Sequence, residues 1–362
     1  MIRFDGVTKR YGQDAVAVDD LTLEAPTGKI TVLVGPSGCG KTTTLRMVNR
    51  MIEATSGSIT IDGVDTASMD PAQLRRGIGY VIQHGGLFPH HTVERNIATV
   101  PLLLGQKKKA ALARARELLE TVGLPQTLAR RYPAQLSGGQ QQRVGVARAL
   151  AADPPVMLMD EPFSAVDPVV RDQLQEEFLR LQGHLGKTIL FVTHDIDEAI
   201  KLGDQVAVLR VGGRLAQVAP PAELLAHPAD DFVAGFVGRD RGYRALSFVT
   251  AEVPVHPERT VDIDGEVTTA DGWVLVTEGG APVGWIDAAA HPGRVRREAL
   301  ALGGTLAESG GSLRAALDAA LSSPSGRGVI LTPEGRVAGT VRAAEVLRAI
   351  EVERGASGEV DR

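Results

Sequence analysis

One glycine-rich segment has the composition and spacing of a phosphate-binding loop. The apolar run Ile30–Val34 precedes Gly-Pro-Ser-Gly-Cys-Gly-Lys-Thr, and a helical pattern begins at Thr43. Glycines let backbone N–H groups converge on an anion, and the start of a helix adds its dipole. In such a loop Lys41 reaches the β- and γ-phosphates and the Thr42 hydroxyl ligates Mg²⁺. The candidate phosphate-contacting residues are Gly35, Pro36, Ser37, Gly38, Cys39, Gly40, Lys41, Thr42 and Thr43.

Two adjacent carboxylates follow a second apolar run, Val156–Met159. We expect this run to form a parallel strand beside the phosphate loop. Neighbouring side chains on an extended chain point in different directions, so Asp160 and Glu161 can serve different purposes. We expect Asp160 to hold Mg²⁺ through water and Glu161 to polarise the attacking water, the two roles that phosphoryl transfer requires. A solvated turn is the alternative, and the phosphate loop disfavours it.

Two other polar residues follow strand-like runs. Gln83 comes after Gly79–Ile82, and His194 comes after Thr188–Val192. Each by itself is typical of a capping or hydrogen-bonding residue. An acidic capping pattern that begins at Asp195 predicts a helix there, and this helix start fixes the direction of the His194 side chain.

A second helix start also has the composition of an anion site. Leu136 is followed by Ser137, Gly138, Gly139 and Gln140, and the helical pattern runs on to about Leu150. Small residues at a helix N-terminus expose backbone N–H groups. The chain has a single phosphate loop with its lysine, Lys41, and so binds one nucleotide. A second anion site in the same chain is therefore unexplained. A two-fold dimer resolves this if each Ser137 segment closes over the nucleotide of the other chain.

The sequence patterns around these residues predict the strands and helices of an α/β fold. Short β-branched runs alternate with helical patterns as far as about residue 238, as in a mostly parallel sheet. The runs Ile30–Val34, Val156–Met159 and Thr188–Val192 each end in a polar or glycine-rich motif. Ligands of open α/β sheets bind at those carboxyl ends.

The composition is that of a globular protein with two domains. The chain has 362 residues, a net charge of −5 and a pI near 5.9, so it has no strongly basic field for nucleic acid. The single cysteine, Cys39, excludes an intramolecular disulfide and indicates a reducing compartment. No apolar run approaches the roughly 18–20 residues that cross a bilayer, and the charged N-terminus is not typical of a secretory signal. A cytoplasmic location is the default expectation.

The pattern weakens after Gly238, where we place a domain boundary and a linker over residues 239–260. Beyond it, Val274–Gly284 aligns without gaps on Val329–Gly339, 55 residues later. Each copy predicts a strand, a turn, a second strand and an alanine-rich helix. Residues 261–362 are therefore expected to form two packed copies of one unit.

The motifs together resemble the ATP-binding subunit of an ABC transporter, over residues 1 to about 238. The resemblance implies a P-loop ABC ATPase domain with a helical subdomain, which hydrolyses ATP with Mg²⁺. It identifies the Walker A loop at Gly35–Thr43, the signature motif at Leu136–Gln140 and the D-loop at Ser164–Asp167. It further implies the Walker B acid Asp160, the catalytic Glu161, the Q-loop Gln83, the switch histidine His194, and Tyr11 stacked on adenine.

The roles that follow from this resemblance overlap. The implied catalytic residues are Glu161, His194, Gln83 and Lys41. The implied metal ligands are Thr42, Gln83 and Asp160. The implied nucleotide contacts are Tyr11, Gly35 through Thr43, Gln83, Ser137, Gly138, Gly139, Gln140, Asp160 and Asp167.

Within this family the segments Tyr80–His90, Leu158–Phe163 and Thr193–Lys201 look most like importers of quaternary amines, which take up glycine betaine, choline, carnitine or proline. Such subunits often carry tandem CBS domains, and residues 261–362 resemble a degenerate pair. Where CBS units have Thr and Asp to hold a ribose, this chain has Asp287 and Ala290, or Arg342 and Glu345. Ionic-strength sensing or dimer packing is as consistent with this domain as nucleotide binding.

The resemblance implies a homodimer of ATP-binding subunits, membrane permease subunits, an extracytoplasmic solute-binding protein as an indirect partner, and no nucleic acid. It implies a location on the cytoplasmic face of the membrane through the permease. Three alternatives stay open: an importer of polyamines or other organic solutes, a soluble ABC ATPase, and a module that binds ATP without hydrolysing it. The acidic pI and the Gln83 region disfavour the soluble ATPase, and Glu161 with His194 disfavours the module.

Overall fold

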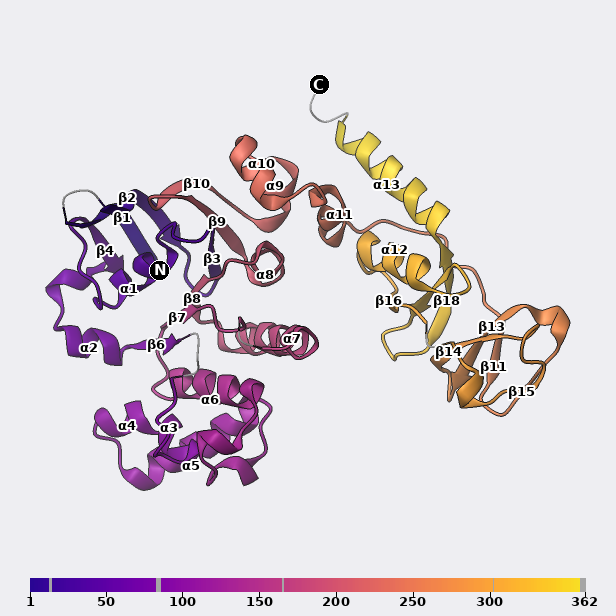
Figure 1. Cartoon of the computed structure of the whole chain (residues 1–362), viewed down its shortest axis with the longest axis horizontal. Coiled ribbons are helices and arrows are strands. Elements are labelled where there is room, and N and C mark those ends of the chain that lie inside the picture. The colour runs from indigo at the N-terminus through magenta and orange to yellow at the C-terminus, as the bar shows by residue number, and fades with distance from the viewer. Residues whose placement is uncertain (13–14, 83–85, 165, 302, 359–362) are drawn as a thin grey trace. The chain divides into compact units, whose positions relative to one another are not determined.

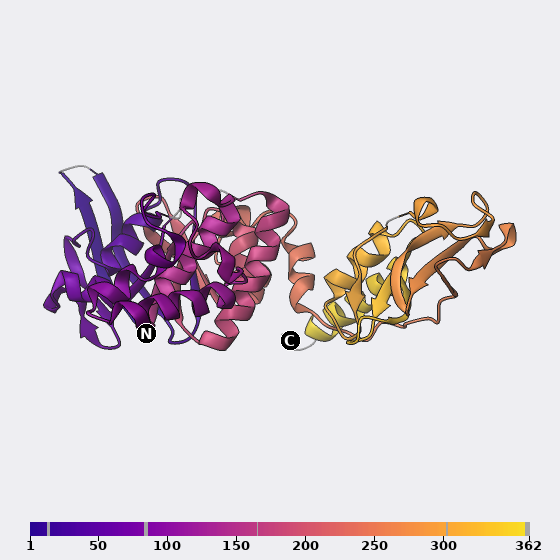
Figure 2. The ribbon, with the colours of Figure 1, turned by 90° about the horizontal axis from the view of Figure 1, so that it is seen from below.

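The computed structural model describes residues 1–12, 15–82, 86–164, 166–301 and 303–358 (Figures 1 and 2). The chain divides into two compact units, Met1–Gly238 and Arg239–Arg362. No helix in these ranges is long and apolar enough to cross a membrane.

The first unit is built on a six-stranded sheet in the order β10-β9-β3-β8-β7-β6. Five strands run parallel and β10 is antiparallel to β9, which confirms the mostly parallel α/β fold. All five residues of β3 are buried, as expected where helices or other strands cover both faces of a sheet. The strands are β3 (Ile30–Val34), β6 (Ile78–Val81), β7 (Val156–Asp160), β8 (Thr188–Val192), β9 (Gln205–Arg210) and β10 (Arg214–Ala219).

The strand that carries the two acids is not the neighbour of the phosphate-loop strand. β8 lies between β3 and β7, pairing with each in parallel. The sequence did not indicate this insertion, because strand order depends on long-range pairing that apolar runs do not encode. Since all three strands end at one edge, Asp160 still reaches Thr42.

A second, antiparallel sheet packs over helix α1 (Lys41–Val48) in the first unit. Its order is β2-β1-β4-β5. Phe4 and Leu21 from this sheet, Leu45 from α1, and Leu158 and Leu190 from the six-stranded sheet share one buried cluster. Burial of each such side chain contributes roughly 1.5–3 kcal/mol. The strands are β1 (Ile2–Tyr11), β2 (Ala15–Ala25), β4 (Ser56–Ile61) and β5 (Val64–Asp65).

The other helices of this unit include a separate helical layer formed by α3, α4, α5 and α6 (Figure 1). Their bounds are α2 (Pro71–Arg76), α3 (Val93–Ile97), α4 (Thr99–Leu103), α5 (Lys108–Thr121), α6 (Gly138–Leu150), α7 (Pro168–Leu185), α8 (Ile196–Leu202), α9 (Pro221–Ala226) and α10 (Asp231–Val237).

The second unit contains two three-stranded sheets with the same pairing pattern. In β11-β13-β14 and in β16-β17-β18, the first pair is parallel and the second is antiparallel. The strands are β11 (Thr260–Asp262), β12 (Glu266–Val267), β13 (Trp273–Glu278), β14 (Ala281–Asp287), β15 (Gly293–Arg294), β16 (Ala307–Glu308), β17 (Arg327–Leu331) and β18 (Val337–Arg342). The helices are α11 (Arg241–Ala245), α12 (Leu313–Ser322) and α13 (Ala343–Gly358).

The sequence repeat corresponds to β13-β14 and β17-β18. Gly284 pairs with Val276 and Gly339 pairs with Ile330, and each hairpin has its irregularity directly after that strand residue. A Cβ at Gly339 would lie 2.4 Å from the carbonyl oxygen of His256, so the backbone approach there requires glycine.

Two expectations for this region were wrong. The first copy is not followed by a helix, because Ala288–His291 forms a turn and Pro292 disfavours helical backbone at the residue before it. The segment 239–260 is not a free linker, because it begins the second unit and contains α11. Leu246 within it is buried with Leu313 and Val346 in the core of that unit.

Candidate functional site

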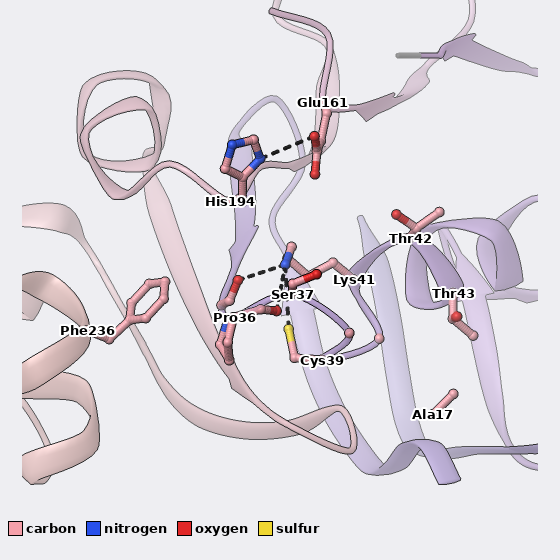
Figure 3. Close-up of a pocket in the computed structure, with 13 residues that line it drawn as sticks. Ala17, Pro36, Ser37, Cys39, Lys41, Thr42, Thr43, Glu161, His194 and Phe236 are labelled. Carbon is pink, nitrogen blue, oxygen red and sulfur yellow. Dashed lines mark hydrogen bonds and ion pairs between the residues drawn. The ribbon is translucent and has the colours of Figure 1, made fainter. Parts of the chain in front are cut away.

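The phosphate loop borders a cavity of about 580 Å³ at the carboxyl edge of the six-stranded sheet (Figure 3). Glu161 and His194 reach the cavity from the ends of β7 and β8, and Phe236 from α10. The lining residues are Ala17, Gly35, Pro36, Ser37, Gly38, Cys39, Gly40, Lys41, Thr42, Thr43, Glu161, His194 and Phe236.

Two glycines fix the course of the loop through close backbone contacts. A Cβ at Gly35 would lie 2.4 Å from the carbonyl oxygen of Leu209, and one at Gly40 would lie 2.2 Å from that of Ala17. Gly38 has a φ of +77° but open space around it, so its requirement is conformational. The loop therefore wraps tightly against β2 and β9 while one of its sides stays open to the cavity.

Lys41 is folded back over the loop it follows. Its Nζ donates to the carbonyl oxygens of Gly35 and Pro36 at 2.7 and 3.1 Å, and it contacts the Cys39 sulfur at 3.7 Å. These three partners are uncharged, so the contacts leave the ammonium charge available to attract an anion. The side chain is buried beside the first turn of α1, where the helix dipole acts in the same direction.

The oxygen atoms next to the loop fit a magnesium ion. The Thr42 hydroxyl donates to Asp160 Oδ1 at 3.0 Å, which brings a hydroxyl and a buried carboxylate together at the edge of the cavity. Hard oxygen ligands of this kind suit Mg²⁺. Burial raises the pKa of Asp160, while the Thr42 hydrogen bond and the Arg46 charge oppose that rise. A bound dication would favour the ionised carboxylate further.

Glu161 turns away from Asp160 because its backbone is left-handed. Its φ is +46°, and its N–H donates to the carbonyl oxygen of Val192 at 3.0 Å. A non-glycine residue in this region costs about 1–3 kcal/mol, and such strained backbone is often found at active sites. The turn brings Glu161 Oε2 within 3.2 Å of His194 Nδ1, as Figure 3 shows. A carboxylate and an imidazole thus converge on the cavity that holds Lys41.

The structure brings most of the predicted residues together and leaves others apart. The whole loop Gly35–Thr43, Glu161 and His194 line one cavity, and Asp160 contacts Thr42 at its edge. Gln83 lies outside the described residues. The signature residues Ser137–Gln140, Tyr11 and Asp167 do not line this cavity.

The signature segment forms an open helix start elsewhere in the same unit. The Ser137 hydroxyl accepts from the Gln140 N–H at 3.3 Å, and Gln140 Oε1 accepts from the Ser137 N–H at 3.1 Å, a reciprocal capping box. Ser137 and Gly138 are exposed, and a Cβ at Gly138 would meet nothing within 4 Å. The N-terminus of α6 is therefore ordered and accessible.

Tyr11 and Asp167 occupy exposed positions. The Tyr11 side chain is 46% exposed, and the ammonium of Lys9 lies 5.0 Å from its ring centroid. Asp167 directly precedes α7, and its carbonyl oxygen accepts from the N–H of Arg171 at 2.7 Å. Their predicted contacts with a nucleotide stay predictions.

The motif analysis missed three residues of this site. Phe236 is far from every motif in sequence, and no spacing signal connects it to the cavity that it lines. Arg46 lies 3.8 Å from Asp160 Oδ2, and Tyr80 lies close enough to both side chains for them to affect its pKa. Burial, followed by the Asp160 charge, raises the pKa of Tyr80. The position of Tyr80 just before Gln83, on a strand paired with β7, is a signal that could have found it.

Comparison with known proteins agrees with this geometry. The family model described as ABC transporter matches residues 18–164. The chain is 54% identical over 256 residues to the osmoprotectant import ATP-binding protein OsmV of Salmonella typhimurium, covering 69% of this chain and 67% of that protein. It is 47% identical to the carnitine transport ATP-binding protein OpuCA of Listeria monocytogenes, covering 79% and 75%. It is also 47% identical to the glycine betaine uptake ATP-binding protein YehX of Escherichia coli, covering 78% and 92%.

Solved structures agree at the level of the first unit. A dimeric ATP-binding cassette bound to ADP and phosphate aligns with a TM-score of 0.56 and 32% identity, covering 61% of this chain and 99% of that one. The cbiO1 protein of Clostridium perfringens aligns with a TM-score of 0.58 and 26% identity, covering 62% and 90%. The predictions of a P-loop ABC fold, of ATP hydrolysis and of ATP with Mg²⁺ are confirmed. The chain belongs to the family of ATP-binding subunits of ABC transporters.

Proposed function

We propose that this chain hydrolyses ATP to energise the import of quaternary-amine osmoprotectants through a separate membrane permease. The observation that carries the proposal is the convergence of Lys41, Glu161 and His194 on one cavity in a chain 54% identical to an osmoprotectant import protein. Relatives named for carnitine and glycine betaine support the same class of solute.

In the proposed reaction the loop amides and Lys41 bind the phosphates of ATP. Thr42 and Asp160 would hold the Mg²⁺, which when bound neutralises charge on the phosphate oxygens. Glu161 accepts the proton of the attacking water at its carboxylate, and His194 holds Glu161 through Nδ1 while its exposed ring reaches the terminal phosphate. We assign Gln83 to sensing of the permease, on the resemblance.

We propose a homodimer in which each signature segment completes the site of the other chain. The exposed, capped N-terminus of α6 supports this arrangement, because Ser137 and Gly138 present accessible backbone N–H groups away from the cavity of their own chain. The dimeric cassette described above supports it as well. In this dimer Tyr11 and Asp167 are assigned to the nucleotide and the D-loop contact, and the chain sits on the cytoplasmic face of the membrane through the permease.

The test is ATP hydrolysis by the chain purified with its permease. Glycine betaine, choline, carnitine, proline and polyamines are added one at a time with the matching solute-binding protein. Stimulation by a quaternary amine is the expected result. Stimulation by polyamines alone would favour the other importer class, and hydrolysis in a chain that captures no permease would favour the soluble ATPase.

We propose that the second unit is a degenerate tandem CBS-like regulatory domain. It contains the expected region 261–362, and its core is formed by two related sheets. Its paired hairpins support this assignment. A chain ending at Gly238 should keep basal ATP hydrolysis and lose the salt response of the full chain. A truncated chain with an unchanged salt response would limit the second unit to packing.

A further inference from the structure

Three buried polar side chains lie directly behind the turn that carries His194. Gln175 comes from α7, Glu198 from α8 and Thr193 from the end of β8, and they are 6%, 6% and 2% exposed. Gln175 Nε2 donates to Glu198 Oε1 at 2.9 Å, and the Thr193 side chain lies beside the same carboxyl, where it lowers the pKa that burial raises. Burial of a carboxyl group is costly, so its hydrogen bonds must offset a large desolvation penalty.

The Thr193 hydroxyl, which lies beside this carboxyl, also holds the backbone around His194. Thr193 Oγ1 accepts from the N–H of Asp195 at 3.0 Å, and the N–H of Thr193 donates to the carbonyl oxygen of Leu33 at 3.2 Å. The residues on both sides of His194 are therefore held by hydrogen bonds. Asp195 also caps α8 through the N–H groups of Asp197 and Glu198, at 2.9 and 3.4 Å.

We propose that Glu198 is a positioning residue for His194, holding the Thr193–Asp195 turn against α7 so that the imidazole stays within reach of Glu161. This inference rests on the proposed role of His194 in hydrolysis. Glu198 touches neither substrate nor the reacting atoms, and it acts only through the turn.

The hydrogen bond between Gln175 and Glu198 has a second consequence, which follows from where α7 begins. This helix starts at Pro168, directly after the D-loop segment that the proposed dimer brings against the other chain. Because Gln175 lies on the second turn of α7, its hydrogen bond to Glu198 joins this helix to the start of α8, next to the turn that holds His194. The link therefore connects the dimer contact to the hydrolytic site.

The test compares Glu198→Leu, Glu198→Gln and Gln182→Leu in the chain purified with its permease. Gln182 is the matched control, because it is buried on the same helix and donates to the carbonyl oxygens of Gly28 and Lys187 at 3.3 and 2.6 Å. Steady-state kcat, KM for ATP and thermal midpoint are measured for each variant. Gln182→Leu reports the cost of losing buried hydrogen bonds away from His194.

We expect Glu198→Leu to lower kcat about tenfold or more with KM changed less than about twofold, since small displacements of a positioned group cost rate rather than binding. Glu198→Gln should restore kcat, because its amide keeps the shape and can hydrogen-bond both neighbours. Gln182→Leu should lower the thermal midpoint comparably and leave kcat near wild type. Equal kcat in Glu198→Leu and Gln182→Leu would overturn the proposal.

Two further variants keep the outcome decisive. If Glu198→Leu does not fold, Gln175→Leu removes the donor from α7 alone, and it should also lower kcat; an unchanged kcat there counts against the link. His194→Ala separates this inference from the proposed function. An active His194→Ala variant refutes the role of His194 itself, whereas an inactive one beside a fully active Glu198→Leu refutes only the positioning role.

Discussion

Replacing Glu161, the acid at the cavity whose backbone is left-handed, is the sharpest test of the hydrolytic mechanism. In Glu161→Gln the amide has the size of the carboxyl group, and the side chain is 21% exposed, so neither a cavity nor an overpacked contact results. The backbone strain at φ +46° is the same for glutamine as for glutamate. We therefore expect the free energy of unfolding to change by less than about 0.5 kcal/mol.

The expected loss of rate is far larger. Without a carboxylate at Oε2 the attacking water has no proton acceptor at this position, and general base catalysis typically contributes about 10²–10⁴-fold. The kcat for ATP should fall by that factor, which corresponds to roughly 2.7–5.5 kcal/mol in the barrier. ATP affinity should stay within about twofold, because Lys41 and the loop are unchanged.

The assay is steady-state ATP hydrolysis with the permease present, alongside equilibrium binding of ATP. Asp153→Asn is the matched control. Asp153 is also an acidic residue with a left-handed backbone, with φ +51°, but its side chain pairs with Lys187 on the surface. That variant should keep the wild-type kcat. A Glu161→Gln variant that binds ATP and turns over within threefold of wild type would refute the assignment of Glu161 as the base.

Three other substitutions probe the loop, the metal site and the buried carboxyl. Gly40→Ala should abolish ATP binding and lower the free energy of unfolding by at least about 1 kcal/mol, measured by denaturant titration, because φ is +91° and the new Cβ would collide with the Ala17 carbonyl oxygen. Thr42→Ala should raise the Mg²⁺ concentration for half-maximal nucleotide binding about tenfold, while Thr42→Ser, which keeps the hydroxyl beside Asp160, should not. Burial raises the pKa of Glu198 above its ordinary value of 4.5. The contribution of Glu198 to the free energy of unfolding is therefore complete below that pH and is lost as pH rises through the folded-state pKa. The stability of wild type relative to Glu198→Gln, from urea unfolding, should therefore decrease as pH rises from about 4.5, and a pH-independent difference would contradict this.

The errors made from the sequence have specific physical causes. The alanine-rich stretch after the first repeat copy favours a helix by propensity, but Pro292 closes the segment immediately after its first turn. The segment 239–260 reads as a linker because its α11 helix is short and weakly patterned, yet Leu246 in it reaches the core of the second unit. In both cases the structure of the segment follows from one residue, Pro292 or Leu246, and not from the segment's average composition.

The sequence alone determined the local parts of the hydrolytic site. The loop Gly35–Thr43 and the pair Asp160 and Glu161 are read from spacing within one strand and the turn after it, because short-range backbone geometry is set by neighbours in the chain. Tertiary structure alone placed β8 between β3 and β7, turned Glu161 toward His194, and brought Phe236 into the cavity. Those contacts join residues more than 30 positions apart, and they depend on strand order and helix packing that no local pattern specifies.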